Sequence, residues 1–152
     1  MAAPRREELI LKISDLIRHM FRRARWSPTQ ALGRRGEDLA HRYLQNHGFT
    51  IVARNYRLST GEAEADIIAR DGEALVFVEV KTRESAEFGP PERAIGEEKR
   101  EHLLKIARAY ARKSSTPWEQ VRFDVVTVIL AGSPVVAHYR DALPTRARRA
   151  SR

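Results

Sequence analysis

The sequence predicts an α/β protein with a mixed sheet and helices on its faces, and three observations lead to that fold class. Helix-like and strand-like segments alternate in the order helix, three strands, helix and two strands. Asp71-Gly72 lies between two of the strand-like segments and is a strong signal for a tight hairpin. The segment ALVFVEV at 74–80 is apolar almost throughout, which is typical of a central strand covered on both faces.

Three helices are expected from apolar residues that recur at helical spacing. Ser27 is a suitable N-cap with Pro28 at the first helical position, and Gly48 is a natural residue to end the same helix. An extra helix precedes it and carries arginines on the face opposite its apolar residues. The expected helices span residues 5–24, 28–47 and 94–113.

The expected strands are short runs of β-branched and aromatic residues bounded by turn-forming residues. The run RFDVVTVIL follows the last helix, and a turn at Gly132-Ser133-Pro134 separates it from a short final strand. A polar stretch with Gly89-Pro90-Pro91 predicts a loop after the central strand. The expected strands span residues 49–57, 64–70, 73–82, 122–130 and 135–140.

The composition fits one compact domain with additional sequence. The chain has 152 residues, of which 42% are hydrophobic and 32% charged, as is ordinary for a globular protein. No apolar run reaches the roughly 20 residues that span a bilayer, and no apolar segment near the N-terminus fits a signal peptide. Because the chain has no cysteine, disulfides, thiolate metal sites and cysteine nucleophiles are excluded. We therefore expect a cytoplasmic protein without stable membrane insertion.

The net charge of +8 is confined to the two ends of the chain. Residues 1–30 contain seven basic and three acidic side chains, and residues 140–152 contain five basic and one acidic. The segment 31–139 between them is neutral, with sixteen side chains of each sign. Basic ends attract phosphates, although solubilising arms and segments that touch anionic lipid have the same composition. Charge alone therefore does not identify the partner.

Charged side chains gather where two neighbouring predicted strands meet. Glu79 and Lys81 lie two residues apart on one strand, so they share a face. With Asp71-Gly72 as the two-residue turn, the register sets Glu64 opposite Glu79 and Asp66 opposite Phe77. Asp66 is then a diagonal neighbour of Glu79, within about 7–8 Å. The prediction is that three carboxylates crowd one face beside a single ammonium group.

Such crowding is unfavourable without a counter-charge, because like charges across a strand pair destabilise it. One interpretation is that Lys81 neutralises one acid and a proton neutralises another. The interpretation that we favour places a divalent cation among the carboxylate oxygens, since the sequence offers no second basic partner on that face. Asp66, Glu79 and Glu64 are accordingly the candidate ligands of Mg²⁺ or Mn²⁺.

Two further charged residues fall on apolar helix stripes. Glu37 lies on the buried stripe of the second helix, so its carboxylate is expected to face the sheet. Gly33 and Gly36 near it would allow another backbone or a phosphate to approach closely. Glu37 is too far from the helix start for a simple interaction with the helix dipole. Lys99 lies four residues before Leu103 at the start of the next stripe, where it would contact a phosphate or extend to solvent.

Several ordered motifs carry a family resemblance. They are Gly33-x-x-Gly36-Glu37, Arg54-Asn55, Glu64-x-Asp66-x-Ile68-Ala69, Val76-Phe77-Val78-Glu79-Val80-Lys81-Thr82-Arg83, Phe88-Gly89, Lys99 and Arg122-Phe123-Asp124. Over about residues 31–130 the chain resembles the YraN-like family of uncharacterised bacterial proteins. That family is similar in its core pattern to archaeal Holliday-junction resolvases, within the PD-(D/E)xK, restriction-endonuclease-like superfamily.

The resemblance implies a restriction-endonuclease-like three-layer core of order αβββαβ with a mixed central sheet, to which the helix expected at residues 5–24 is an addition. It implies metal ligation by Asp66 and Glu79, a catalytic role for Lys81, and an accessory acid at Glu37. The domain organisation is then a basic amphipathic helix extension at 1–27, a nuclease-like domain at 28–140 and an Arg-rich tail at 141–152. The candidate nucleic-acid contacts are Lys99, Arg83, Arg34 and Arg35.

The chain departs from the family pattern just before Asp66. The family usually has Gly-Glu-Ile-Asp, whereas this chain has Ala63-Glu64-Ala65-Asp66. A Gly-Glu pair occurs two residues earlier, at Gly61-Glu62. Either Glu62 or Glu64 is therefore the equivalent of the family's glutamate.

The expected activity is hydrolysis of nucleic-acid phosphodiesters, with branched or damaged DNA as the candidate substrate. One or two Mg²⁺ ions would neutralise the scissile phosphate and activate water for in-line attack. Lys81 would orient that water or stabilise the growing charge on the phosphate. The alternatives are a catalytically silent nucleic-acid-binding module and a scaffold that docks other proteins. A homodimer is also left open.

Overall fold

The structure is a computed structural model that describes residues 27–85 and 95–143. The chain divides into two units, residues 1–34 and 35–152. The helix expected at 5–24 and the tail expected at 141–152, from residue 144 onward, lie outside the described residues. The predicted domain boundaries stay a prediction.

Five strands and two α-helices make up the described part of the chain, with one short 3₁₀ helix, η2. Their order along the chain confirms the predicted succession of helix, three strands, helix and two strands, and the ends agree to within about three residues. The 3₁₀ helix was not predicted, since a single short turn has no periodic signal. The elements are α2 (Pro28–Asn46), β1 (Thr50–Arg57), β2 (Glu64–Asp71), β3 (Ala74–Arg83), α3 (Glu97–Lys113), η2 (Trp118–Gln120), β4 (Val121–Ile129) and β5 (Val135–Tyr139).

The predicted ends of α2 follow from local hydrogen bonds. Ser27 Oγ accepts a hydrogen bond from the Gln30 amide, and Gln30 Oε1 accepts one from the Ser27 amide, which is a capping box. At the other end, Gly48 has a φ of 87°, and the Phe49 amide donates to the Leu44 carbonyl. The left-handed conformation that ends the helix favours glycine at this position.

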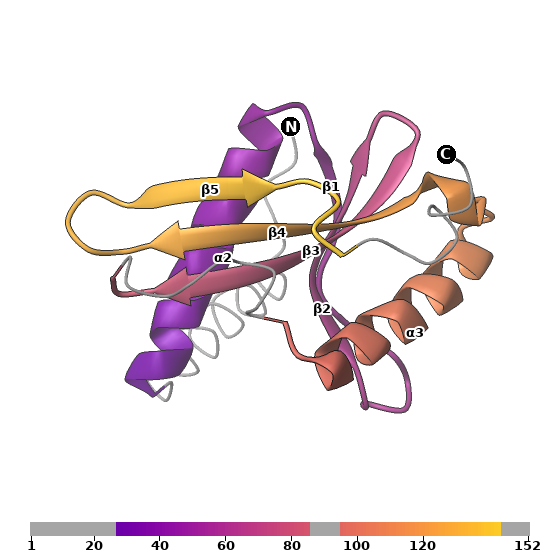
Figure 1. Cartoon of the computed structure of the whole chain (residues 1–152), viewed down its shortest axis with the longest axis horizontal. Helices are drawn as coiled ribbons and strands as arrows, with labels where there is room; N and C mark the ends of the chain where they lie inside the picture. The colour runs from indigo at the N-terminus through magenta and orange to yellow at the C-terminus, as the bar shows by residue number, and fades with distance from the viewer. Residues whose placement is uncertain (1–26, 86–94, 144–152) are drawn as a thin grey trace, which may run out of the picture. The chain divides into compact units, whose positions relative to one another are not determined.

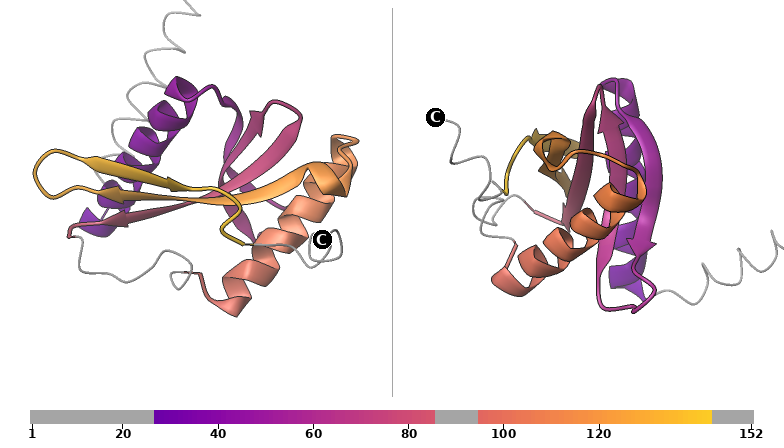
Figure 2. Two further views of the ribbon diagram at one scale, coloured as in Figure 1. Left: turned by 45° about the horizontal axis from the view of Figure 1, so that its top comes forward. Right: turned by 90° about the vertical axis from the view of Figure 1, so that its right-hand side faces the viewer.

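The five strands form one mixed sheet in the order β1-β2-β3-β4-β5 (Figure 1). Strands β3 and β4 are parallel and are connected through α3, whereas the other neighbouring pairs are antiparallel. The part of α2 that follows residue 34 covers one face of the sheet, and α3 covers the other (Figure 2). This is the restriction-endonuclease-like αβββαβ order, followed by one more strand.

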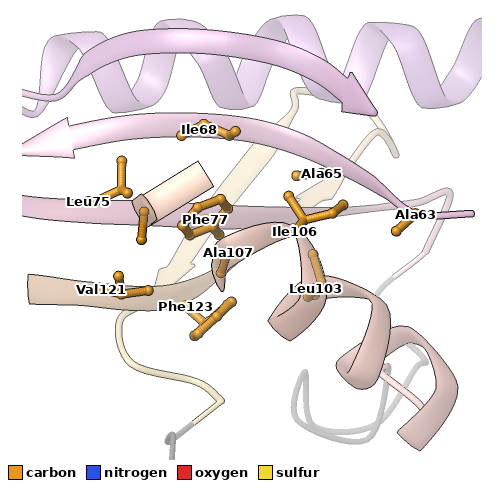
Figure 3. Packing of buried hydrophobic residues seen from close by; sticks show 11 residues of the cluster. Ala63, Ala65, Ile68, Leu75, Phe77, Leu103, Ile106, Ala107, Val121 and Phe123 are labelled. Carbon is orange, nitrogen blue, oxygen red and sulfur yellow. The ribbon is translucent and has the colours of Figure 1, made fainter. Parts of the chain in front are cut away.

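The core has two layers, one on each face of the sheet. The α3 side contains Leu103, Ile106 and Ala107 of the helix packed against Phe77 and Phe123 of the sheet (Figure 3). The α2 side contains small and branched residues of the helix and sheet, including Ala40, Leu44, Ile67, Val76, Val78, Val126 and Val128. Strand β3 supplies side chains to both layers, which confirms its prediction as a central strand.

Gly36 marks a close approach of α2 to the sheet. It is buried, and a Cβ added there would lie 2.8 Å from Thr82 Cβ of β3. The sequence predicted a close approach by a backbone or a phosphate, and the neighbour within the fold is the Thr82 side chain. Because the Cβ of Thr82 is itself too close, a different Thr82 rotamer would not make room for a larger residue at position 36.

Candidate functional site

The site begins where two neighbouring strands separate. Backbone pairing of β2 and β3 begins at the hairpin with the pair Asp71 and Ala74 and ends with the pair Ile67 and Val78. Beyond that point β2 continues beside β1, and β3 continues beside β4. Figure 1 shows the two strands diverging. The next residue on each strand, Asp66 on β2 and Glu79 on β3, therefore lies in the opening of this fork.

The predicted hairpin register was wrong by two residues. Asp71 pairs with Ala74, so the two-residue turn is Gly72-Glu73, with Gly72 at a φ of 58°. A shift of two residues keeps each side chain on its face but moves its partner along the strand. Phe77, expected opposite Asp66, pairs with Ile68 instead.

Asp66 closes the fork with a side-chain hydrogen bond. The Val80 amide of β3 donates to Asp66 Oδ2 at 2.8 Å. The alternation of β2 also changes here, because Ala65 and Ile68 both pack on the α3 side while Ile67 packs on the α2 side. The Asp66 carboxylate thus accepts the hydrogen bond from a β3 amide at the point where the backbone pairing of β2 and β3 ends.

The environment of Asp66 disfavours its charged form. Burial raises its pKa to about 7, and the nearby charges of Glu79 and Glu37 act in the same direction. The hydrogen bond from Val80 and the charge of Lys99 act in the opposite direction but are outweighed. A buried carboxyl group with this pKa is stabilised by either a proton or a cation.

Glu79 is buried, with a relative exposure of 5%, and two ammonium groups lie against it. Lys81 Nζ is 3.3 Å from Glu79 Oε1, and Lys99 Nζ is 3.4 Å from Glu79 Oε2. Lys99 also donates to the backbone carbonyl of Glu64 at 3.2 Å, so its ammonium group is held at the fork while about a third of the side chain stays exposed. The predicted shared face of Glu79 and Lys81 is confirmed, and Lys99 is the second basic partner that the sequence did not reveal.

Glu37 faces the sheet from α2, as predicted, with 17% of its side chain exposed. Arg54 of β1 lies 3.6 Å from Glu37 Oε2 and 2.8 Å from Asp38 Oδ1. Asn55, at a φ of 50°, follows Arg54, and Tyr56 then packs on the α3 side. The left-handed residue therefore allows Arg54 to reach the acids of α2 while the next aromatic ring faces the opposite layer.

The donors at the fork suit a hard divalent cation. The described residues include no group of three or more His, Cys, Asp or Glu side chains arranged to hold a metal ion. Mg²⁺, however, is commonly held by one or two carboxylates, with water and substrate phosphates as the other ligands. Among the described residues, Glu79 Oε2 and Glu37 Oε2 are buried without a hydrogen-bond partner. Asp66 and Glu79 therefore fit such an ion, with Glu37 nearby.

Glu64 is not part of the predicted trio of carboxylates. It pairs with Arg57 across β1 and β2, and its Oε2 lies 2.7 Å from the Arg57 guanidinium. Glu62 is exposed and pairs with Lys105 at 2.6 Å. The expectation that Glu64 lies opposite Glu79 was wrong because the register differs and because β2 leaves β3 before reaching Glu64.

The other predicted nucleic-acid contacts are two arginines on α2 and one at the end of β3. Arg35 is exposed on α2, and Arg34 is exposed at the end of the first unit. Arg83 is partly buried at the end of β3, where its carbonyl accepts a hydrogen bond from the Leu130 amide. Of the four residues, Lys99 is the one that the structure brings to Glu79.

Comparison with known proteins gives a family match over the segment that contains this site. The model of the uncharacterised protein family UPF0102 matches residues 36–128. A UPF0102 protein of Solibacter usitatus is 54% identical over 110 residues, which cover 72% of this chain and 83% of the relative. A UPF0102 protein of Nocardia farcinica is 44% identical over 119 residues, which cover 77% of this chain and 92% of the relative. The chain belongs to the UPF0102 family.

Membership in UPF0102 confirms the resemblance to the YraN-like family. The match includes Glu37, Asp66, Glu79, Lys81 and Lys99 and excludes the basic ends of the chain. A UPF0102 protein of Geobacter metallireducens is 40% identical over 114 residues, or 74% of this chain and 92% of the relative. Within the described residues, no helix of this UPF0102 chain combines the length and apolarity required to cross a membrane.

Asp124 has a structural role that sequence reasoning missed. Its side chain is fully buried and accepts hydrogen bonds from Arg122, His138 and the Asp141 amide at 2.8–3.0 Å. Arg122 also donates to Asp71 Oδ2 at 2.9 Å, which ties β4 to the β2–β3 hairpin. The motif Arg122-Phe123-Asp124 gave a signal, since alternate charged residues in an apolar strand require partners on one face.

Proposed function

We propose that this UPF0102 protein is a divalent-metal-dependent nuclease that hydrolyses nucleic-acid phosphodiesters. The observation that carries the proposal is the pair of carboxylates at the strand fork, the partly buried Asp66 and the buried Glu79, with two lysines against Glu79. Mg²⁺ or Mn²⁺ bound there would supply charge neutralisation at the phosphate and Lewis-acid activation of water. Asp66 and Glu79 would hold the ion.

The chain's own side chains have distinct parts in this chemistry. Lys81 lies on the partly exposed side of Glu79, so its ammonium group is placed to stabilise negative charge on the phosphate or to orient water. Lys99, one third exposed, would contact a neighbouring phosphate oxygen. Glu37 would act as the accessory acid from the α2 side, held in place by Arg54.

Catalysis accounts for the site better than binding alone does. Buried acids repel phosphate, so a module that only binds nucleic acid gains nothing from Asp66 and Glu79 at the contact point. Each acid also costs free energy to bury, and Asp66 has its pKa raised for that reason. The proposal places the protein in the cytoplasm with its nucleic-acid substrate.

The test is a cleavage assay on branched, single-stranded and duplex DNA, and on RNA, in Mg²⁺ or Mn²⁺. We expect the wild type to cut at least one of these substrates, and Lys81→Met to reduce the rate about 10²–10³-fold, because an electrostatic contact to the transition state is lost. Thermal melts of Lys81→Met should still respond to Mn²⁺, since both carboxylates remain.

Lys113→Met is the matched control, because Lys113 is an exposed lysine at the C-terminal end of α3, outside the strand fork. It should cut at the rate of the wild type. Absence of cleavage by the wild type on every substrate would contradict the nuclease and leave the binding module or the protein-docking scaffold. Equal loss of cleavage in both lysine variants would show that Lys81 has no special part in the reaction.

A further inference from the structure

A groove of about 600 Å³ lies at the C-terminal end of α3, away from the strand fork. It runs between the last turns of the helix and the segment that leads to η2. Two arginines, an indole ring and small residues form its walls. The lining residues are Arg108, Ala111, Arg112, Ser115, Thr116, Pro117 and Trp118.

The wall formed by residues 114–118 is held in place by hydrogen bonds. Thr116 is buried, and its hydroxyl bonds to Arg70 of β2 and to Ser114, both at 2.8 Å. The Thr116 amide donates to the Ala111 carbonyl at 2.8 Å, and Ser115 adopts a φ of 51°. A groove with a fixed wall loses little conformational entropy when it binds a ligand.

The two groove arginines also border a second hollow. This hollow measures about 450 Å³ and is lined by Glu101, Leu104 and Lys105 in addition to Arg108 and Arg112. From residue 105 to 113, α3 contains four basic residues and no acidic one. Although the segment 31–139 is neutral as a whole, this end of α3 has a local excess of positive charge.

Trp118 gives the groove a flat aromatic surface. The Arg108 guanidinium lies 5.8 Å from the centre of the Trp118 ring, and Trp118 is partly exposed. Its other contact is with Phe123 of the core, at 6.5 Å between ring centres, which fixes the indole against the domain. A fixed indole beside the Arg108 guanidinium, in a groove that Arg112 also lines, is suited to stacking on an unpaired base next to its phosphates.

We propose that this groove binds a single-stranded segment of nucleic acid, with a base on Trp118 and phosphates on Arg108 and Arg112. The inference shares its substrate class with the proposed nuclease, but it uses none of the residues of the strand fork. Charge and aromatic surface together favour nucleic acid over an acidic peptide, which has no comparable ring to stack. Lys99 and Arg108 are nine residues apart on α3, or roughly 14 Å at 1.5 Å per residue.

The experiment is a titration of the full-length protein with a short oligothymidine in EDTA, so that binding is measured without cleavage. The Trp26→Phe background leaves Trp118 as the remaining tryptophan, since the chain has two. We expect its fluorescence to be quenched on binding, because the base stacks on the indole. A duplex of equal length should quench less, as its bases are paired.

Arginine variants in this background measure the phosphate contacts. Arg108→Gln and Arg112→Gln should each weaken binding about tenfold at 50 mM salt and lower the slope of log K against log salt by about 0.7. Lys113→Gln is the matched control, because it removes one exposed charge from the same helix end outside the groove. It should change both quantities much less.

The outcomes separate this inference from the nuclease. Unquenched Trp118 fluorescence with bound oligonucleotide, or arginine variants that behave like Lys113→Gln, would overturn the groove whatever the cleavage assay shows. Quenching and an arginine-specific loss of affinity in a protein that does not cut DNA or RNA would support the groove and contradict the nuclease. If the oligonucleotide binds without quenching Trp118 and an acidic peptide then displaces it, the nucleic-acid proposal is overturned in favour of a peptide ligand.

Discussion

Replacing Asp66 by asparagine should stabilise the protein in EDTA above pH 7 and remove its response to Mn²⁺. Burial and the charge of Glu79 raise the pKa of Asp66 to about 7, so its carboxylate is costly to keep ionised in the fold. Asparagine keeps the shape and can still accept the hydrogen bond from Val80. The expected gain is on the order of 1–4 kcal/mol in the free energy of unfolding at pH 8.

The pH dependence of this gain has a definite sign. Because the pKa of Asp66 is higher in the folded state, the folded protein holds this proton between about pH 4 and 7 while the unfolded chain has lost it. The contribution of Asp66 to stability therefore falls as the pH rises through that window. Urea unfolding in EDTA at several pH values should show a difference between Asp66→Asn and wild type that grows from pH 4 to 7 and then levels off.

Mn²⁺ should reverse the order of stability of the two proteins. Metal bound only by the folded state stabilises it, by about 2.7 kcal/mol at a concentration of 100 times Kd. The wild type should gain this stability at pH 8, and Asp66→Asn should gain little because it has lost a charged ligand. If Mn²⁺ raised the free energy of unfolding equally in both proteins, the metal would bind elsewhere. If Asp66→Asn were less stable than the wild type at pH 8 in EDTA, the free-energy cost assigned to the Asp66 charge would be wrong.

Replacing Asp124 by asparagine should destabilise the domain strongly, by about 3–5 kcal/mol. Burial acts to raise the pKa of Asp124, but hydrogen bonds from His138 and Arg122 outweigh it and lower that pKa. The substitution removes the fully buried carboxylate that accepts hydrogen bonds from Arg122, His138 and the Asp141 amide. It leaves Asp71 as the acidic partner of Arg122. Urea unfolding at pH 7 measures the loss.

Arg140→Gln is the control for this cluster. Arg140 is more than half exposed and reaches Asp71 at 3.2 Å, so its removal should cost less than about 1 kcal/mol. The lowered pKa of Asp124 gives stability that is present above its unfolded pKa and is lost as the pH falls below it. The effect of Asp124→Asn should therefore shrink in acid, and an effect as small as that of Arg140→Gln at pH 7 would refute the structural role of Asp124.

The order of elements was predictable because each one has a local signal. Ser27 and Gly48 mark the ends of α2, and the uninterrupted apolar run of β3 marks a central strand. These signals depend on backbone conformation and burial, which a short segment determines by itself. The 3₁₀ turn after α3 has no such signal, because it consists of only three residues, Trp118–Gln120.

The candidate site was predictable in its residues but not in its contacts. Glu79 and Lys81 share a face because of strand periodicity alone, and Glu37 faces the sheet because of helix periodicity alone. The partners of Glu79 and Glu64 depend on the register of the β2–β3 hairpin. That register changed because the two-residue turn lies one residue later in the chain than the sequence predicted. The contact of Lys99 with Glu79 depends on how α3 packs on the sheet, which sequence periodicity does not specify.

Crystals grown with Mn²⁺ and measured for anomalous scattering test the central claim most directly. We predict a manganese peak in the strand fork, with oxygens of Asp66 and Glu79 at about 2.1–2.2 Å and the ammonium groups of Lys81 and Lys99 displaced from Glu79. A fork without a manganese peak at millimolar Mn²⁺, with both lysines still against Glu79, would contradict the metal site and the nuclease that depends on it.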